Sequence, residues 1–109
     1  MKLISILLRE FKLDVVKQAL NEVDVVALTV VEARDYSPQF HGTAAWRGYL
    51  HTMSSSPKLE VQVVVHDDDV DAVVDSVMRA ARTGAPGDGH ICVIPVDHRY
   101  SITSGRREA

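Results

Sequence analysis

The stretch KLEVQVVVHDDDVDAVVDSVMRAARTGAPGDG, residues 58–89, decides the fold because it contains two apolar periodicities and a glycine-rich turn. Over residues 58–66, one set of alternate residues is apolar and the other is mostly polar, a pattern typical of a strand with one packed face and one partly wet face: Leu59, Val61, Val63 and Val65 against Glu60, Gln62, Val64 and His66. Over residues 70–81, apolar residues recur at helical spacing. Three aspartates at 67–69 lie where acids cap a helix start and suit its dipole. The stretch predicts a strand, a helix and a turn into another strand.

The turn itself, residues 83–89 (TGAPGDG), has three glycines in seven residues. Such a loop needs unusual torsions or a close neighbour, and its successive N–H groups can form an anion-binding nest. An alternative is a helix C-cap at Gly84 followed by a tight turn, and the pattern alone favours that alternative. The loop is not a Walker motif, because no Lys-Ser/Thr pair follows the glycines, and it ends a helix, unlike the dinucleotide fingerprint.

The sequence on either side completes a recognisable element order. The predicted strands are 2–8, 25–34, 58–66 and 90–96, and the predicted helices run from Phe11 to Val23 and over 70–81. Strand–helix–strand–strand–helix–strand is the α+β, ferredoxin-like order, with two helices on one face of a four-stranded antiparallel sheet. The opposite face must be exposed or meet another copy, and its apolar content favours a subunit contact. Pro95 suggests that the last strand ends at an edge or bulge. We expect a single domain over residues 1–109.

Composition narrows the class of protein. The formal net charge is −3, which argues against nucleic acid as a partner. Cys92 is the single cysteine, which excludes an internal disulfide and a multi-cysteine metal site, and we expect it to be a buried strand residue. The N-terminal apolar run stops at Arg9 without a small-residue cleavage site, and no run reaches membrane-spanning length. The expected location is the cytoplasm, without membrane insertion.

A long insertion, residues 36–57, separates the two middle strands and carries four of the six aromatic residues. Loops of this length are usually functional or disordered, and aromatics with arginine are typical anchors of docking surfaces. The candidate docking residues are Phe40, Trp46, Tyr49 and His51, with Arg47 beside them. The alternative is that Trp46 and Tyr49 pack back on the domain; the length of the segment favours docking.

These features together resemble the PII signal-transduction proteins over nearly the whole chain. The matching stretches are Phe11–Asp14, Leu28–Val30 with Glu32, Arg47-Gly48, Pro57-Lys58, Asp67-Asp68 with Val70-Asp71, Thr83-Gly84 and Gly87–Gly89. The resemblance implies a compact homotrimer, adenine nucleotides in clefts between subunits, and a long loop (the T-loop) that docks on a transporter or enzyme. It favours a nucleotide-binding glycine loop over a simple C-cap.

The resemblance also implies which residues bind the nucleotide. Gly87, Asp88 and Gly89 would cradle phosphate and ribose, Thr29, Gln62 and Val64 would line the adenine pocket, and the loop base from Tyr36 through Ser37 and Pro38 to Gln39 would close over the phosphates. The C-terminal tail, residues 98–109, could fold over a neighbour's nucleotide.

Departures from the family pattern predict which nucleotide binds. His90 stands where the family usually has lysine, and Ser101 and Thr103 stand where it has arginines that hold the terminal phosphates. A cation on a phosphate contributes about 1.5–3 kcal/mol, so their loss weakens ATP most and AMP least. We therefore expect ADP or AMP to bind at least as well as ATP, with Mg²⁺ required only for ATP. Arg99, Arg106 and Arg107 are offset and could compensate.

Several functions remain open on the sequence. A family branch tied to inorganic carbon uptake favours ADP or AMP and lacks the modified tyrosine, as this chain does at His51; bicarbonate would suit a site near Arg47 or Lys58. The alternative is an orthodox nitrogen regulator that binds Mg-ATP and 2-oxoglutarate, since Gln39 and Lys58 are retained.

Two further classes carry less support. A metal-binding trimer of the same fold would use some of the five histidines, but none has the close spacing of a strong site. An enzyme would need a nucleophile and base, and apart from the Asp88–His90 pair no such arrangement is legible. We therefore assign no catalytic residues and no metal ligands, and we expect a regulator.

Overall fold

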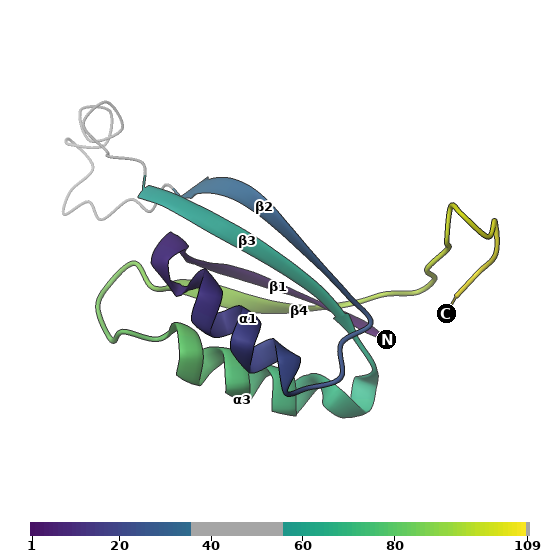
Figure 1. The fold of residues 1–109 in the computed structure, drawn as a ribbon, viewed down its shortest axis with the longest axis horizontal. Coiled ribbons are helices and arrows are strands. Elements are labelled where there is room, and N and C mark those ends of the chain that lie inside the picture. Colours follow the sequence, from purple (N-terminus) through teal and green to yellow (C-terminus); the bar gives the residue numbers. More distant parts are fainter. Residues whose placement is uncertain (36–55, 109) are drawn as a thin grey trace, which may run out of the picture.

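The structure, a computed structural model, describes residues 1–35 and 56–108 and confirms the predicted ferredoxin-like fold. Its strands are β1 (Lys2–Arg9), β2 (Ala27–Asp35), β3 (Ser56–Val65) and β4 (Gly89–Pro95), and its main helices are α1 (Leu13–Asn21) and α3 (Val70–Ala81). They form one four-stranded sheet in the order β2-β3-β1-β4, and every neighbouring pair is antiparallel (Figure 1).

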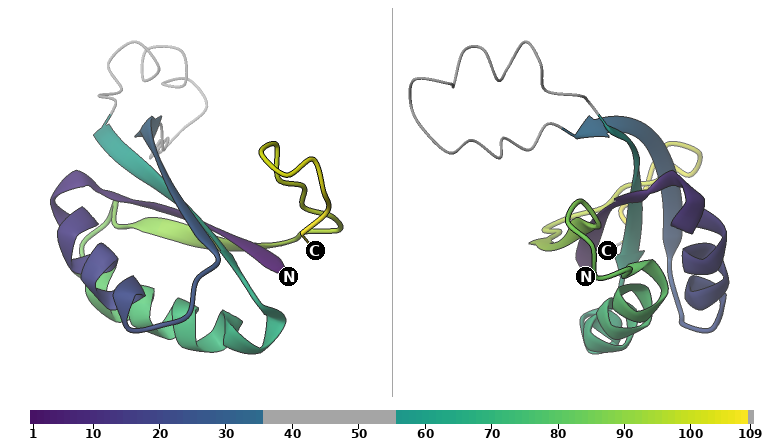
Figure 2. Two further views of the ribbon diagram at one scale, coloured as in Figure 1. Left: turned by 45° about the vertical axis from the view of Figure 1, so that its right-hand side comes forward. Right: turned by 90° about the vertical axis from the view of Figure 1, so that its left-hand side faces the viewer.

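The core lies between the sheet and the two helices. Alternate residues of the central strands, Ile4, Ile6 and Leu8 in β1 and Val61, Val63 and Val65 in β3, are buried and meet Val16 and Leu20 of α1 and Val73 and Val77 of α3. Both helices cover the same face of the sheet (Figure 2). The alternation predicted for residues 58–66 is therefore confirmed, because one set of side chains enters the core and the other does not.

Both helices begin with a short 3₁₀ turn, at Glu10–Lys12 before α1 and at Asp67–Asp69 before α3. The predicted capping role of the acids at 67–69 is wrong: neither His66 nor Asp69 makes a side-chain capping hydrogen bond. Asp67 instead accepts a 2.7 Å hydrogen bond from the amino group of Met1, because β1 begins beside the end of β3. That cation lowers the pKa of the Asp67 carboxyl.

On the opposite side of the sheet, which we call the open face, residues 1–35 and 56–108 place no helix (Figure 2). Register places Thr29, Gln62, Ser5 and Cys92 in one row across this face, and Val31, Glu60, Leu7 and His90 in the next. Cys92 is exposed, so the prediction that it is buried is wrong: β4 is an edge strand, and Cys92 points to the face that the helices leave uncovered.

The C-terminal tail leaves the sheet at the end of β4 and folds on itself. Tyr100 and Arg107 form an isolated bridge, Ser101 N–H donates to the Arg106 carbonyl, and Arg99 forms an ion pair with Glu108. The side chain of Ile102 is fully exposed. In Figure 1 the tail lies at the opposite end of the sheet from the glycine loop, which joins α3 to β4.

Candidate functional site: the glycine loop and the open face

The glycine loop, residues 83–89, lies where β1 ends and β3 begins, and its last residue, Gly89, is the first residue of β4. The helix α3 ends at Ala81, and its C-cap is Arg82, whose backbone is extended (φ −74°, ψ 130°), so Gly84 is not the helix cap itself. Gly84, Gly87 and Gly89 all have positive φ. Three left-handed residues fold the chain back sharply enough to enter β4 directly.

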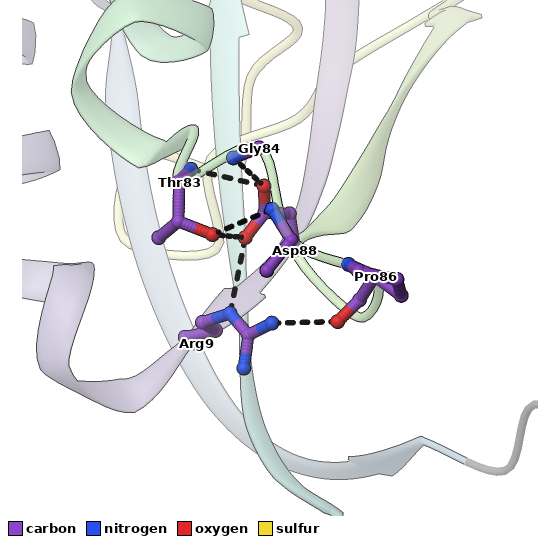
Figure 3. A network of polar contacts seen from close by, with 6 residues as sticks. Arg9, Thr83, Gly84, Pro86 and Asp88 are labelled. Carbon is purple, nitrogen blue, oxygen red and sulfur yellow. Dashed lines mark hydrogen bonds and ion pairs between the residues drawn. The ribbon is translucent and has the colours of Figure 1, made fainter.

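Asp88 fills the first part of the loop with its own carboxylate (Figure 3). The carboxylate accepts hydrogen bonds from the N–H groups of Thr83 and Gly84, at 2.9 and 2.8 Å, and another from the Thr83 hydroxyl. These bonds, with one from Arg9, hold the pKa of the Asp88 carboxyl well below its ordinary value. The amides of Thr83 and Gly84 are thus engaged by an internal anion, and any phosphate must use the later amides of the loop.

Arg9, the last residue of β1, reaches across to this loop. Its Nε donates to Asp88 at 3.0 Å, and its Nη2 donates to the Pro86 carbonyl at 2.7 Å (Figure 3). The Arg9 and Asp88 side chains are 25% and 22% exposed, so the ion pair is partly shielded from water. Sequence reasoning missed Arg9; the signal was its place at the end of the strand that pairs with the residue after the loop.

Gly87 and Gly89 lie so close to neighbouring groups that a side chain at either position would contact them. A Cβ at Gly89 would lie 1.8 Å from the Leu7 carbonyl oxygen, because β4 begins hard against β1. A Cβ at Gly87 would lie 3.3 Å from Arg9 Nη2 and 3.9 Å from Lys58 Nζ. Two cations therefore converge beside the Gly87 backbone. Lys58 is only 2% exposed and pairs in register with Arg9.

The residues predicted to line an adenine pocket occupy the other half of the open face. Thr29 and Gln62 are directly paired across β2 and β3, and Val64 pairs with Ala27. Gln62 donates to Glu60 at 3.3 Å, and Ser5 donates to the same carboxylate at 2.8 Å. Three inter-strand steps, or about 14 Å, separate Thr29 from β4. One protomer therefore places Thr29 and the glycine loop on the same face but does not bring them into contact.

The positions where cations are replaced do not all lie together. His90 is exposed on β4 directly after the glycine loop and pairs with Leu7. It also borders a hollow of about 230 Å³ next to α3, with Ile6, Met78 and Arg82 among the lining residues. Ser101 and Thr103 belong to the tail, beyond the far end of β4.

The remaining candidates fall outside the described residues. They are the predicted loop-base residues Ser37 and Gln39, the anion candidate Arg47, and the docking residues Phe40, Trp46, Tyr49 and His51. Within residues 1–35 and 56–108, no three His, Cys, Asp or Glu side chains gather in a way that could hold a metal ion. In that same part of the chain, no helix is long and apolar enough to span a membrane.

Comparison with known proteins identifies the family. The family profile described as "Nitrogen regulatory protein P-II" matches residues 1–106. The "Nitrogen regulatory protein P-II" of Microchaete diplosiphon is 42% identical over 107 residues, covering 98% of this chain and 96% of its own. That of Synechocystis sp. is 41% identical over 108 residues, with 99% and 96% covered. "Nitrogen regulatory protein P-II 1" of Escherichia coli is 38% identical over 108 residues, with 99% and 96% covered. Matches of this extent show that the chain belongs to the nitrogen regulatory protein P-II family.

Proposed function

We propose that this chain is an adenine-nucleotide sensor that favours ADP or AMP and regulates a transporter or enzyme through its long loop. PII proteins are regulatory signal transducers rather than enzymes, and as a family they bind adenine nucleotides and 2-oxoglutarate. The observation that carries the proposal is the Gly87–Gly89 segment, which lies with Arg9 and Lys58 beside it at the edge of the open face. Backbone amides next to two cations are a chemical match for phosphate.

The charges near this segment favour a short phosphate chain. Arg9 is shared with Asp88, so the net local charge from Arg9, Asp88 and Lys58 is one positive unit. His90 adds no fixed charge, and the tail offers Ser101 and Thr103 in place of arginines. Every adenine nucleotide carries more negative charge than this one unit can neutralise, and the excess is largest for the triphosphate and smallest for the monophosphate.

The proposed site needs more than one copy of the chain. PII proteins are trimers, and two features of this protomer agree with a shared site. Thr29 lies about three inter-strand steps from the glycine loop, and the tail begins seven β4 residues, or about 24 Å, beyond it. The open face also carries half-buried Leu3 and Leu7 and exposed Ile94 that a neighbouring subunit would cover.

A second candidate is the orthodox nitrogen regulator that binds Mg-ATP and 2-oxoglutarate. It is favoured by Lys58, which is buried next to Gly87 and supplies a desolvated cation suited to a carboxylate. The relatives named above are all called nitrogen regulatory proteins. A third ligand to test is bicarbonate, a small anion that the same cation could hold. We place the protein in the cytoplasm on the strength of its family.

Isothermal titration calorimetry distinguishes these functions. Purified protein is titrated with ATP, ADP and AMP, each with and without Mg²⁺, and then with 2-oxoglutarate or bicarbonate in the presence of each nucleotide. ADP or AMP that binds at least as tightly as ATP supports the first proposal, and an effect of bicarbonate on that binding extends it to inorganic carbon. Binding of 2-oxoglutarate only with Mg-ATP, and a clear preference for ATP, would show the second. No nucleotide binding at all would overturn both.

A further inference from the structure

The glycine loop has few contacts that could hold its shape. Residues Thr83 to Gly87 are exposed, and Ala85 and Pro86 do not enter the core. Among the described residues, no backbone–backbone hydrogen bond joins two positions within 83–88. Since neither burial nor a backbone ladder fixes the loop, its conformation depends on side-chain hydrogen bonds.

Those side-chain bonds converge on two groups. The Asp88 carboxylate binds the first residues of the loop, and the Arg9 guanidinium binds both Asp88 and the Pro86 carbonyl. Arg9 therefore joins two points of the loop on either side of Gly87. A planar guanidinium can span two acceptors in fixed geometry, which a single ammonium group cannot do.

Arg9 also ties the loop to the strands. It ends β1, and its partner in register is Lys58, which stands near the start of β3 where the chain returns from the long insertion. The loop, Arg9 and Lys58 all meet at Gly87. A displacement of the guanidinium would alter the loop and the neighbourhood of Lys58 together.

We propose that Arg9 is the positioning residue of the glycine loop: by bridging Asp88 and the Pro86 carbonyl, it holds the Gly87–Gly89 amides in the arrangement that receives a nucleotide phosphate. This inference rests on the proposed function for its ligand, but the ordering of the loop is a separate, measurable property. On this proposal, Arg9 affects nucleotide affinity by ordering the loop and not by stabilising the hydrophobic core.

The test measures the loop and the ligand separately in the full-length protein. Hydrogen exchange of the Thr83 and Gly84 amides, followed by NMR without ligand, reports on the loop, and calorimetry with ADP and AMP reports on binding. The variants are Arg9→Gln, Arg9→Lys and Asp88→Asn. The matched control is Arg79→Gln, which removes the same charge from an exposed position on α3. Circular dichroism and thermal melting show whether each variant is folded.

In Arg9→Gln and in Asp88→Asn, we expect both amides to exchange at least about tenfold faster and ADP affinity to fall about tenfold or more, as for loss of a charge-assisted bond. Arg9→Lys should recover less than half of either change, because it keeps the charge and loses the bridge. Arg79→Gln should match the wild type. Asp88→Asn leaves β1 intact, so it still tests the idea where Arg9→Gln does not fold.

Three outcomes would overturn the inference. One is unchanged exchange and affinity in Arg9→Gln; another is full rescue by Arg9→Lys, which would make Arg9 a simple point charge. The third is weaker binding with unchanged exchange, which would make Arg9 a direct ligand contact. Faster exchange in a protein whose wild type binds no nucleotide would support the ordering of the loop by Arg9 and overturn the proposed function instead.

Discussion

The glycine loop and the C-terminal tail are both short, irregular segments with glycine at positive φ, and each has an acid that pairs with an arginine, yet they are held in different ways. In the glycine loop, Asp88 pairs with Arg9, which lies 79 residues earlier in the sequence, at the end of the neighbouring strand β1. In the tail, Arg99 pairs with Glu108, nine residues along the same segment. The loop is thus tied to the sheet of the protomer, whereas the described ion pair of the tail joins two residues of the tail itself.

The strongest test of this contrast compares glycines. Gly89→Ala would force a Cβ to 1.8 Å from the Leu7 carbonyl oxygen at φ +108°, and backbone cannot yield there without separating β4 from β1. We expect a loss of about 3 kcal/mol or more in the free energy of unfolding, measured by urea denaturation.

The control for Gly89 lies in the tail. Gly105→Ala has a positive φ of +69° but nothing within 4 Å of its new Cβ, so only the backbone conformation is penalised, by about 1 kcal/mol. The penalty falls on the local fold of the tail, so the global unfolding midpoint should move much less than in Gly89→Ala. Equal losses in the two variants would contradict the view that the loop is framework and the tail is not.

A second test asks whether the tail completes a site on another copy. Replacing Ser101 and Thr103 together by arginine should raise ATP affinity by at least about tenfold and AMP affinity by less, because each added cation contributes about 1.5–3 kcal/mol when it meets a phosphate. Calorimetry with both nucleotides measures the ratio. The control is Ile102→Arg, which adds a charge between these positions, on a fully exposed side chain. An equal gain in Ile102→Arg would mean only that positive charge attracts nucleotides at long range.

The fold was predictable because apolar residues recur with the period of a strand in one segment and with the period of a helix in the next. Val61, Val63 and Val65 alternate with mostly polar neighbours, and Val73 and Val77 recur at helical spacing, so the choice of strand and helix needed no tertiary information. The site was predictable only in part. The glycine-rich composition of residues 83–89 indicated that Gly87 and Gly89 belong to an unusual loop. The hydrogen-bond partners of Asp88, however, depend on which strand ends beside that loop. Nothing in the local sequence of Arg9 shows that it reaches residues 86 and 88.

The two wrong predictions, burial of Cys92 and helix capping by the aspartates at 67–69, also arise from contacts between parts of the chain that are distant in sequence. Cys92 lies in an apolar run and was expected to be buried, but β4 is an edge strand and burial of its open face depends on another copy. The aspartates at 67–69 have the composition of a helix cap, but Asp67 finds the Met1 amino group across the sheet. Local composition cannot show whether an aspartate will bind a nearby backbone amide or a cation that the fold places beside it.

A third test uses pH to measure how far Asp88 stabilises the loop side of this comparison. The pKa of Asp88 is lowered from its ordinary value of 3.8, so its carboxylate stabilises the folded state at all pH values above that range. The contribution is lost as the pH falls below about 4 toward the lower folded-state pKa. The stability difference between wild type and Asp88→Asn should therefore be constant from pH 7 to pH 5 and shrink at pH 3 and below, in urea denaturation. A difference that grows on acidification would mean that the pKa is raised and not lowered.

The smallest change in stability is expected from breaking the ion pair of the tail. This test sharpens the comparison because the tail and the glycine loop each use one arginine and one acid. Glu108→Gln breaks the ion pair with Arg99, in which the two side chains are 31% and 41% exposed. Pairs this exposed contribute about 0–1 kcal/mol, so the free energy of unfolding should change by less than about 1 kcal/mol. The small effect of this variant should disappear in high salt, because the Debye length shortens to about 3 Å at 1 M salt and the pair is then screened. The free energy of unfolding is measured in dilute protein and again at concentrations that favour assembly. A larger loss of stability only in the assembled protein would show that a second copy shields the ion pair of the tail. A large loss in the isolated protomer would instead make the tail part of the framework and remove the distinction between these two segments.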